Sequence, residues 1–196
     1  MKKIGIFGSS FNPIHIGHLM MMEQARVRFN LDKILLIPTK NAYHKKETSL
    51  SFEKRYMMAK IEADKNEFFE ASDIELQLTG NSYTYELLKL LKKERPQDRF
   101  YFIMGADSLI NFHTWYRYES LIHDMTYLVF SRPGEASIDD LIKSYRLKGM
   151  QVHLISDLQL QISSSQIRDS VSDKRSIRYL VTDDILNHIF EKGYYG

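Results

Sequence analysis

Two hydrophobic patterns alternate along this chain. Short continuous apolar runs, bounded by glycine, proline or polar residues, are typical of strands that are buried on both faces. Such runs lie at 4–7, 33–37, 99–104, 125–130 and 152–155. Between them, apolar residues recur at every third or fourth position, as Leu19, Met22, Ala25 and Phe29 do. This spacing predicts amphipathic helices between the strands.

Polar residues at the borders of these segments predict where the helices begin and end. Ser82 or Thr84 is a candidate N-cap for the helix that precedes the run at 99–104. Before it, Ile74, Leu76 and Leu78 alternate with polar residues, which predicts a half-exposed strand that follows Phe69. The same kind of evidence predicts helices over about 15–30, 51–64, 84–91, 137–148 and 182–193, short helices over 109–124, and a helix that begins at Ser163.

The alternation of strands and helices predicts an α/β fold with a doubly wound, mostly parallel sheet. No internal repeat and no linker divides the sequence, so we expect one domain over 1–196, with 163–196 as a small C-terminal helical part. In such sheets the ligand lies beyond the carboxyl ends of the strands. The loops at 8–18, 38–45, 105–108 and 131–134 all follow strands, so we expect them to converge at one edge.

Composition narrows the class of protein only slightly. The chain of 196 residues is 43% hydrophobic, which is enough for a packed core, and its net charge is +2. This near balance gives no indication of a nucleic-acid partner. There is no cysteine, which fits a reducing cytoplasm and leaves no thiol nucleophile. No apolar segment approaches the length of a membrane span, and the first residues resemble a strand rather than a signal peptide.

The first 19 residues have the features of an anion site. A strand at 4–7 leads into Gly8, Ser9 and Ser10, and a helix follows. Backbone amides of such a loop, together with the dipole of the helix, favour a phosphate. His15 and His18 lie three residues apart, on one face of the first helical turn. Imidazole N–H groups at a phosphate site fit phosphoryl or nucleotidyl transfer, which needs positioning and charge stabilisation.

Two segments then identify a resemblance. Residues 8–18, GSSFNPIHIGH, resemble the G-x-F-[ND]-P-x-H-x-G-H signature of the HxGH nucleotidylyltransferase superfamily. Residues 162–168, ISSSQIR, resemble its second signature, I-S-S-T-x-I-R, with Ser165 as the hydroxyl in place of threonine. The order and separation of the two segments are similar to those of the bacterial nicotinate-nucleotide adenylyltransferases. The resemblance covers essentially the whole chain and implies a Rossmann-like nucleotidylyltransferase fold.

This resemblance implies adenylyl transfer from ATP to nicotinate mononucleotide, which gives nicotinate adenine dinucleotide and pyrophosphate in NAD biosynthesis. The mononucleotide phosphate attacks the α-phosphorus directly, without a covalent enzyme intermediate. His15, His18 and Arg168 are implied as catalytic residues, although a surface ion pair is the alternative for Arg168. The further ATP contacts that the resemblance implies are Gly8, Ser9, Phe11, Gly105, Asp107, Arg132, Ser163 and Ser164, with an ordinary solvated turn as the alternative at Arg132.

The acceptor side is implied by shorter similarities. Residues 83–84 resemble part of the family's S-Y-T segment, and 115–116 resemble its W-Y segment, so Tyr83, Thr84, Trp115 and Tyr116 are implied contacts of the mononucleotide. A core position is the alternative for Trp115. The loop at 43–45 resembles the family's P-P-H-K loop without its prolines. Within and before that loop, the basic candidates are Lys45 and Lys40, with a solvated lysine pair as the alternative for Lys45.

The sequence shows no metal-ligand spacing, so the only cofactor we expect is Mg²⁺ carried with ATP. The alternatives are adenylyl transfer to nicotinamide mononucleotide or phosphopantetheine, or a nucleotide-binding regulatory module without catalysis. Phosphopantetheine adenylyltransferases usually have T-x-G-H where this chain has His15. Class I aminoacyl-tRNA synthetases also contain HIGH, but this chain lacks a K-M-S-K-S segment. We expect ATP and the mononucleotide as partners, neither nucleic acid nor membrane, and leave a homo-oligomer open.

Overall fold

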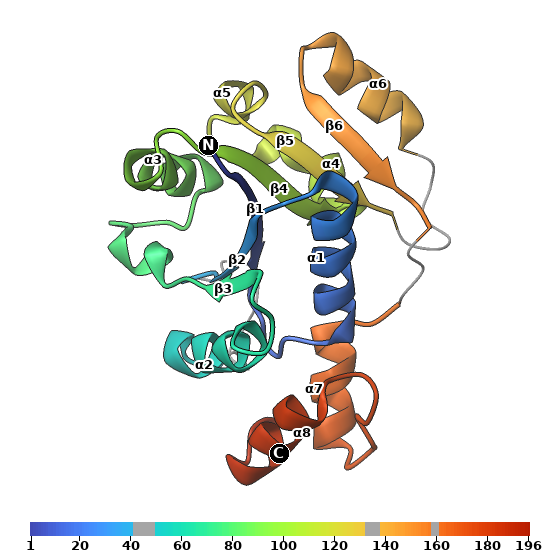
Figure 1. The fold of residues 1–196 in the computed structure, drawn as a ribbon. Coiled ribbons are helices and arrows are strands. Elements are labelled where there is room, and N and C mark those ends of the chain that lie inside the picture. Colours follow the sequence, from blue (N-terminus) through green and yellow to red (C-terminus); the bar gives the residue numbers. More distant parts are fainter. Residues whose placement is uncertain (41–49, 132–137, 158–160) are drawn as a thin grey trace.

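The computed structural model describes residues 1–40, 50–131, 138–157 and 161–196. Within these residues, six strands form one parallel sheet in the order β3-β2-β1-β4-β5-β6 (Figure 1). The sheet therefore extends in both directions from β1 and β4, as a doubly wound sheet does. The strands are β1 (Lys3–Ser9), β2 (Lys33–Pro38), β3 (Phe69–Ala71), β4 (Arg99–Gly105), β5 (Thr126–Phe130) and β6 (Gln151–Ile155).

The sequence places helices or short turns after each strand. Polar residues end several of them as predicted: Asn30 ends α1 in the left-handed conformation, and the Thr182 hydroxyl accepts from the Ile185 N–H at the start of α8. The helices are α1 (Ile16–Phe29), α2 (Phe52–Ala63), α3 (Thr84–Glu94), α4 (Ala106–Ile110), α5 (Tyr118–Leu121), α6 (Asp139–Leu147), α7 (Ser164–Ser172) and α8 (Asp183–Glu191), with 3₁₀ turns η1 (Ile74–Gln77) and η2 (Phe112–Thr114).

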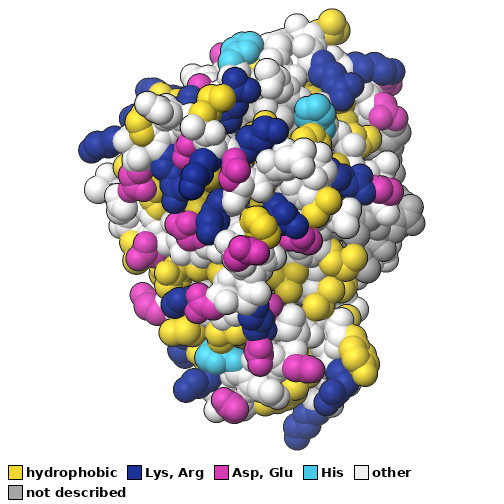
Figure 2. Space-filling model, viewed as in Figure 1, with side chains coloured by type: hydrophobic (Ala, Val, Ile, Leu, Met, Phe, Trp, Pro, Cys, Tyr) yellow, Lys and Arg dark blue, Asp and Glu magenta, His cyan; other side chains and the backbone are white. Residues whose placement is uncertain are grey.

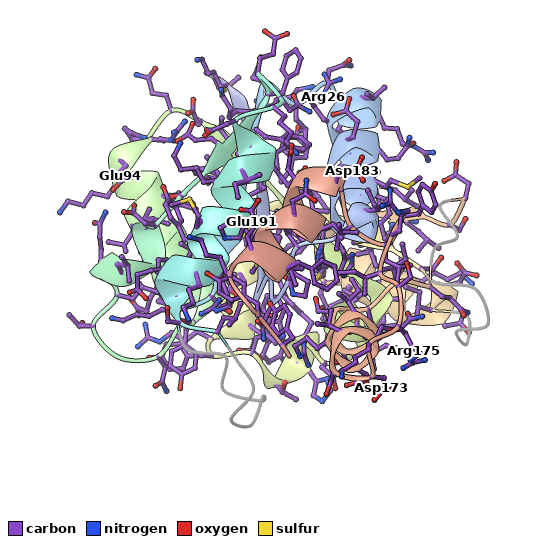
Figure 3. The ribbon with its side chains drawn as sticks, turned by 90° about the horizontal axis from the view of Figure 1, so that it is seen from below. Arg26, Glu94, Asp173, Arg175, Asp183 and Glu191 are labelled. Atoms are coloured by element: carbon purple, nitrogen blue, oxygen red, sulfur yellow. The ribbon has the colours of Figure 1, made fainter. Side chains whose placement is uncertain are left out.

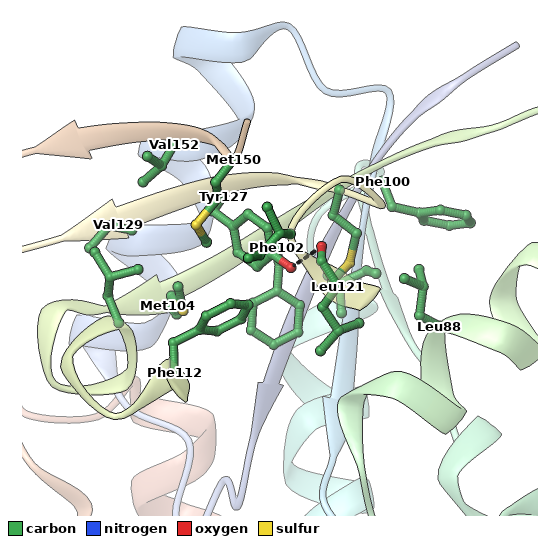
Figure 4. Close-up of a cluster of buried hydrophobic side chains, with 14 of the residues drawn as sticks. Leu88, Phe100, Phe102, Met104, Phe112, Leu121, Tyr127, Val129, Met150 and Val152 are labelled. Carbon is green, nitrogen blue, oxygen red and sulfur yellow. Dashed lines mark hydrogen bonds between the residues drawn. The ribbon is translucent and has the colours of Figure 1, made fainter. Parts of the chain in front are cut away.

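Two hydrophobic clusters form the core, one on each face of the sheet. Alternate residues of a strand point to opposite faces, so Leu35 joins the cluster beneath α3–α6, whereas Ile34 joins the cluster with α1, α2, α7 and α8. Figure 4 shows part of the first cluster, where the Tyr127 hydroxyl donates to the Leu121 carbonyl at 2.7 Å. Burial raises the pKa of this hydroxyl, so it stays a donor.

The C-terminal helices pack against the N-terminal half of the chain. The Ile16 N–H donates to the Leu180 carbonyl at 3.0 Å, which fixes the segment between α7 and α8 at the start of α1. In the view from below, α8 lies beside α2, with Asp183 and Glu191 near its two ends (Figure 3). Residues 163–196 thus pack against α2 and against the start of α1, where the first motif ends.

Two local predictions are wrong. Ile74 to Gln77 forms η1 and not a strand, and in this turn Glu75 is buried while Leu76 is 46% exposed. In this turn the Glu75 carboxylate accepts the Lys40 N–H, which holds its side chain inward. In addition, neither Ser82 nor Thr84 caps α3, because Tyr83 is the N-cap residue and makes no side-chain capping bond.

The surface is mixed in charge. On the face shown in Figure 2, lysine and arginine side chains are interspersed with aspartate and glutamate, in keeping with the net charge of +2. No helix within the described ranges is long and apolar enough to span a membrane.

Candidate active site

A cavity of about 470 Å³ opens at the carboxyl ends of β1 and β4. Here the chain runs outward in opposite directions, since β1 is followed by β2 on one side and β4 by β5 on the other, and such switch points are where doubly wound sheets bind ligands. The polar and small residues on its wall come from the carboxyl ends of five strands, β1 to β5, and from the connections that follow them. They are Gly8, Ser9, His15, Gly17, His18, Thr39, Glu75, Ser82, Thr84, Gly105, Asp107, Ser108 and Ser131.

His15 and His18 cap the first turn of α1 reciprocally. The His15 Nδ1 accepts the His18 N–H at 3.3 Å, and the His18 Nδ1 accepts the His15 N–H at 3.2 Å. Their rings are stacked, with centroids 3.6 Å apart. Because each Nδ1 is an acceptor, each neutral ring carries its proton on Nε2. The pair therefore presents Nε2–H donors at the N-terminus of a helix, as an anion site requires.

Two phenylalanines pack against the His18 ring. Phe7 and Phe11 meet it edge-on, with centroids at 5.6 and 5.3 Å. Phe11 is completely buried and does not lie on the cavity wall, so the structure does not place it where a side-chain contact with ATP was expected. The reason is that its apolar ring fills the core beneath the histidines. Ser9 does line the cavity, and its hydroxyl lies 3.4 Å from the His18 Nε2.

The second motif contacts the first, although the two lie 151 residues apart. Ser163 caps α7 by accepting the Gln166 N–H. The Ser164 hydroxyl donates to the Pro13 carbonyl at 2.9 Å, and the Arg168 Nη1 donates to the Asn12 carbonyl at 2.8 Å. The cavity wall includes none of these three side chains, Ser163, Ser164 and Arg168. In this state, Ser164 and Arg168 hold the loop that carries the histidines.

Gly105 and Asp107 lie on the opposite side of the cavity, at the end of β4 and in the first turn of α4. A Cβ atom at Gly105 would lie 2.5 Å from the Asp107 Oδ1. The absence of a side chain at Gly105 therefore lets this carboxylate lie back against the end of the strand. Of the next loop, Ser131 lines the cavity, whereas the predicted contact Arg132 lies outside the described residues.

The predicted acceptor residues divide into two groups. Thr84 and Trp115 line the cavity, and the Trp115 ring also packs edge-on against Phe102, with centroids at 5.6 Å. Tyr83 and Tyr116 do not line it. Their rings stack on each other, with centroids at 4.6 Å, and they are 38% and 41% exposed. The Trp115 ring thus belongs partly to the core, which is the alternative stated for it, and partly to the cavity wall, and its contact with the mononucleotide stays a prediction.

Of the two predicted lysines, the structure describes Lys40, which does not lie on the cavity wall. The Lys40 Nζ donates to the Leu78 carbonyl at 3.0 Å, and its backbone N–H donates to Glu75. Its ammonium group is thereby occupied by the turn that follows η1, away from the wall. Lys45 falls outside the residues that the structure describes.

Sequence reasoning missed Glu75, whose side chain is 3% exposed and forms part of the wall. Its carboxylate accepts the Lys40 N–H at 2.6 Å and a hydrogen bond from Ser82. Burial raises the pKa of Glu75, and these hydrogen bonds together with the charge of Arg55 oppose that effect. The only sequence signal was its place inside an apolar alternation, and that pattern indicated an exposed side chain.

Sequence reasoning also missed Arg55, which is 2% exposed. Its guanidinium donates to the carbonyls of Ser10 and Thr39, both at 2.8 Å, and to that of Leu50 at 3.0 Å. These carbonyls belong to the loop after β1 and the segments that flank residues 41–49. A single buried cation from α2 therefore joins two of the loops that follow strands. Burial lowers the pKa of this guanidinium from its ordinary value, although arginine stays charged at any working pH.

The comparisons with known proteins agree with this arrangement. A cytidylyltransferase-like family model matches residues 6–170. A protein of Desulfitobacterium hafniense named a probable nicotinate-nucleotide adenylyltransferase is 39% identical over 198 residues, which cover 99% of this chain and 96% of that protein. A Geobacter metallireducens protein of the same name is 35% identical over 212 residues, with 98% of each chain covered.

Solved structures show the same fold. The nicotinic acid mononucleotide adenylyltransferase of Plasmodium falciparum matches with a TM-score of 0.81, both complexed with APC and complexed with NaAD. The sequence identities are 23% and 24%, and each match covers all of this chain and 98% of the other. A putative nicotinate-nucleotide adenylyltransferase from Vibrio parahaemolyticus matches with a TM-score of 0.72 at 23% identity, covering all of this chain and 96% of the other. By its sequence relatives and its family model, the chain belongs to the nicotinate-nucleotide adenylyltransferases, within the cytidylyltransferase-like nucleotidyltransferases.

Proposed function

We propose that this protein transfers the adenylyl group of ATP to nicotinate mononucleotide and thereby forms nicotinate adenine dinucleotide and pyrophosphate in NAD biosynthesis. A phosphate oxygen of the mononucleotide attacks the α-phosphorus of ATP. A new P–O bond forms as the bond to the bridging α–β oxygen breaks, and the electron pair of that bond leaves with pyrophosphate. The proposed setting is the cytoplasm, which fits the lack of cysteine.

One observation carries this proposal: the reciprocal cap of His15 and His18 makes each Nε2 an N–H donor, and both rings line a cavity at a helix N-terminus. In phosphoryl transfer, charge develops on the oxygens around phosphorus and on the leaving group. Preorganised donors stabilise that charge more in the transition state than in the ground state. The relatives named for the same reaction support the assignment.

Residues on the two sides of the cavity receive different substrates in this proposal. Gly8 and Ser9 contribute loop amides to the ATP phosphates, and Asp107 binds the nucleoside of ATP. Thr84 and Trp115 receive the pyridine ring of the mononucleotide, Trp115 by stacking. All of them line one cavity, which supports their assignment to one reaction. Arg168 and Ser163 contact the β- and γ-phosphates only if Arg168 exchanges the Asn12 carbonyl for a phosphate oxygen.

We further propose that Mg²⁺ enters with ATP. Among the described residues, no three histidine, aspartate or glutamate side chains gather as a protein cage for a cation would require. The donor set of this chain therefore fits an ion whose ligands are mostly phosphate oxygens and water, the usual arrangement for Mg²⁺ at a nucleotide. The ion would neutralise charge on the phosphates, while the histidines hold their position.

The decisive experiment compares two acceptors. Purified protein is incubated with ATP, Mg²⁺ and either nicotinate or nicotinamide mononucleotide, and pyrophosphate release is measured. Backbone N–H donors facing a carboxylate would face another donor in the amide, so we expect kcat/KM for the acid to exceed that for the amide by at least about tenfold. Equal efficiency would contradict the assigned acceptor. Binding of ATP without turnover on either acceptor would contradict the enzyme assignment.

A further inference from the structure

The loop at 10–13, which we call the histidine loop because it leads into His15, has polar backbone groups that its own backbone does not satisfy. Side chains from helices far along the chain donate to its carbonyls instead. Arg55 on α2 donates to the Ser10 carbonyl, and Ser164 and Arg168 on α7 donate to the carbonyls of Pro13 and Asn12. Buried carbonyls need such partners, so tertiary contacts and not local sequence set the shape of this loop.

The Asn12 side chain is the most enclosed polar group of the histidine loop, with 1% of the residue exposed. Its Oδ1 accepts the Tyr195 hydroxyl at 2.9 Å and the Leu50 N–H at 3.4 Å. The first bond has ordinary length, whereas the second lies at the outer limit. Of the two hydrogen bonds that described residues donate to this oxygen, Tyr195 therefore supplies the better one, from a position 183 residues farther along the chain.

The structure holds Tyr195 firmly in this position. The chain turns after α8 at Gly193, with φ +62°, and Tyr195 itself has φ +68°. Its ring packs edge-on against Tyr194, with centroids at 6.2 Å, within the cluster that contains Phe11 and Ile14. Burial raises the pKa of the Tyr195 hydroxyl, which keeps its proton available for Asn12.

From this contact we infer that Tyr195 is a positioning residue for the histidine pair. Asn12 lies three residues before His15, and His15 both caps α1 and stacks on His18. When the hydroxyl is lost, the one hydrogen bond to the Asn12 Oδ1 that remains from a described residue is the long one from the Leu50 N–H, and the turn that sets the direction of His15 loosens. The inference rests on the proposed function of these histidines, yet the contact itself is independent of any substrate.

Tyr195→Phe tests the inference because it keeps the ring and removes only the hydroxyl. We expect kcat to fall by about five- to tenfold, as the loss of one hydrogen bond from the transition-state geometry would cause. We expect KM for nicotinate mononucleotide to change less than about twofold, because Thr84 and Trp115 lie on the other wall. A purely structural role would lower the melting temperature without this separation of kcat from KM.

The neighbouring Tyr194→Phe is the matched control. Tyr194 is equally close to the end of α8, and its hydroxyl has no hydrogen bond to any residue that the structure describes. We expect this variant to keep the kcat of the wild type. If both variants lose activity equally, or if Tyr195→Phe retains wild-type kcat, the positioning role is wrong.

A second measurement needs no substrate. In protein with ¹⁵N-labelled histidine, Tyr195→Phe is expected to shift or broaden the imidazole signals of His15 and His18, while Tyr194→Phe leaves them unchanged. Unchanged His15 and His18 signals in Tyr195→Phe would overturn the inference even if kcat fell. If the wild type itself releases no pyrophosphate but the signals respond, the proposed function fails and the positioning contact stands.

Discussion

At the scale of single residues, the site depends on which atoms of each side chain are already engaged. The Nδ1 atoms of His15 and His18 each accept a hydrogen bond from a backbone N–H, so the Nε2 atoms carry the protons and act as donors. The side chains of Ser164 and Arg168 donate hydrogen bonds to carbonyls of the histidine loop. The motif residues thus have two different roles, since the histidines present hydrogen-bond donors whereas Ser164 and Arg168 hold the histidine loop. Single substitutions can test these roles separately.

His15→Asn separates capping from catalysis. Asparagine is a good N-cap residue, so its Oδ1 can still accept the His18 N–H, but it lacks a group at the position of Nε2. We expect turnover to fall by at least about a hundredfold, as for loss of a preorganised donor, with little change in melting temperature. His15→Ala is the control, since it loses the cap as well and should destabilise the protein by about 1 kcal/mol. Normal pyrophosphate release by His15→Asn would contradict the donor role.

His18→Ala examines the second ring of the pair. We expect the variant to fold, because His18 is only partly buried, and to lose most of its turnover. The measurement is pyrophosphate release at saturating ATP and mononucleotide, with circular dichroism as the control for folding. Activity near that of the wild type would remove His18 from the proposed mechanism.

Gly105→Ala probes the Asp107 side chain. The added Cβ would lie 2.5 Å from the Asp107 Oδ1, and the carboxylate, as the free end of a side chain, can rotate away. We expect KM for ATP to rise by about three- to tenfold with the melting temperature nearly unchanged, as an interaction made equally in the ground and transition states predicts. If KM for ATP stays constant in Gly105→Ala, Asp107 does not bind ATP.

At the scale of elements, sequence patterns predicted the strands whose formation depends on local burial. They failed where a contact with a residue far along the chain determines the local structure. The apolar runs at 4–7 and 99–104 became β1 and β4 because each is buried on both faces of the sheet. Glu75 was missed because its partner Lys40 lies 35 residues away, and this contact turned an expected strand into η1. Arg55 gave no signal either, since its three carbonyl partners belong to loops.

The same reasoning explains the outcome at the site. Gly8, Ser9, His15, His18 and Asp107 could be predicted because they directly follow buried strands, and the structure places them all on the cavity wall. For residues on longer connections, the local sequence does not determine which way the side chain points. Arg168 thus turns to the Asn12 carbonyl, and Tyr83 and Tyr116 turn to each other. Their predicted contacts with substrate stay predictions.

Glu75→Ala tests the role of η1 as the link between the end of β2 and the start of α3. The Lys40 N–H and Ser82 lose a buried acceptor, which should cost about 1–3 kcal/mol of unfolding free energy. We also expect KM for the mononucleotide to rise more than KM for ATP, because Thr84 lies on this side of the cavity. Leu76→Ala in the same turn is the control, since Leu76 is largely exposed. Equal changes in both KM values would contradict a role confined to the acceptor side.

At the scale of the whole molecule, packing between the C-terminal helices and the rest makes stability depend on pH. Mainly through burial, the pKa of His188 on α8 is lowered, and its Nε2 has no hydrogen-bond partner within the described part of the chain. The lowered pKa means that the unfolded state binds a proton more readily. Stability from this group is therefore complete above the unfolded pKa of about 6.5 and is lost as the pH falls through the folded value. His153 contributes in the same direction, because burial lowers its pKa too.

We accordingly expect the melting temperature to fall between pH 7.5 and pH 5. Several groups contribute to this fall, and protonation of His188 accounts for a part of it. His188→Phe keeps an aromatic ring against Tyr194 and cannot be protonated, so it should reduce the fall by about 1–3 °C. An identical pH profile for His188→Phe and the wild type would show that this imidazole has no part in it.

The position of the cavity at the switch between β1 and β4 has a consequence for how such a protein diversifies. The histidines come from the segment after β1, whereas Glu75, Thr84 and Trp115 come from the connections after β3 and β4. Substitutions at 74–84 and 112–116 leave Asp107 on α4 unchanged, so they can accumulate without disturbing the residues proposed to bind ATP. Evolution, or a laboratory library restricted to 74–84 and 112–116, can therefore search for new acceptor molecules while the chemistry performed on the nucleotide is inherited intact.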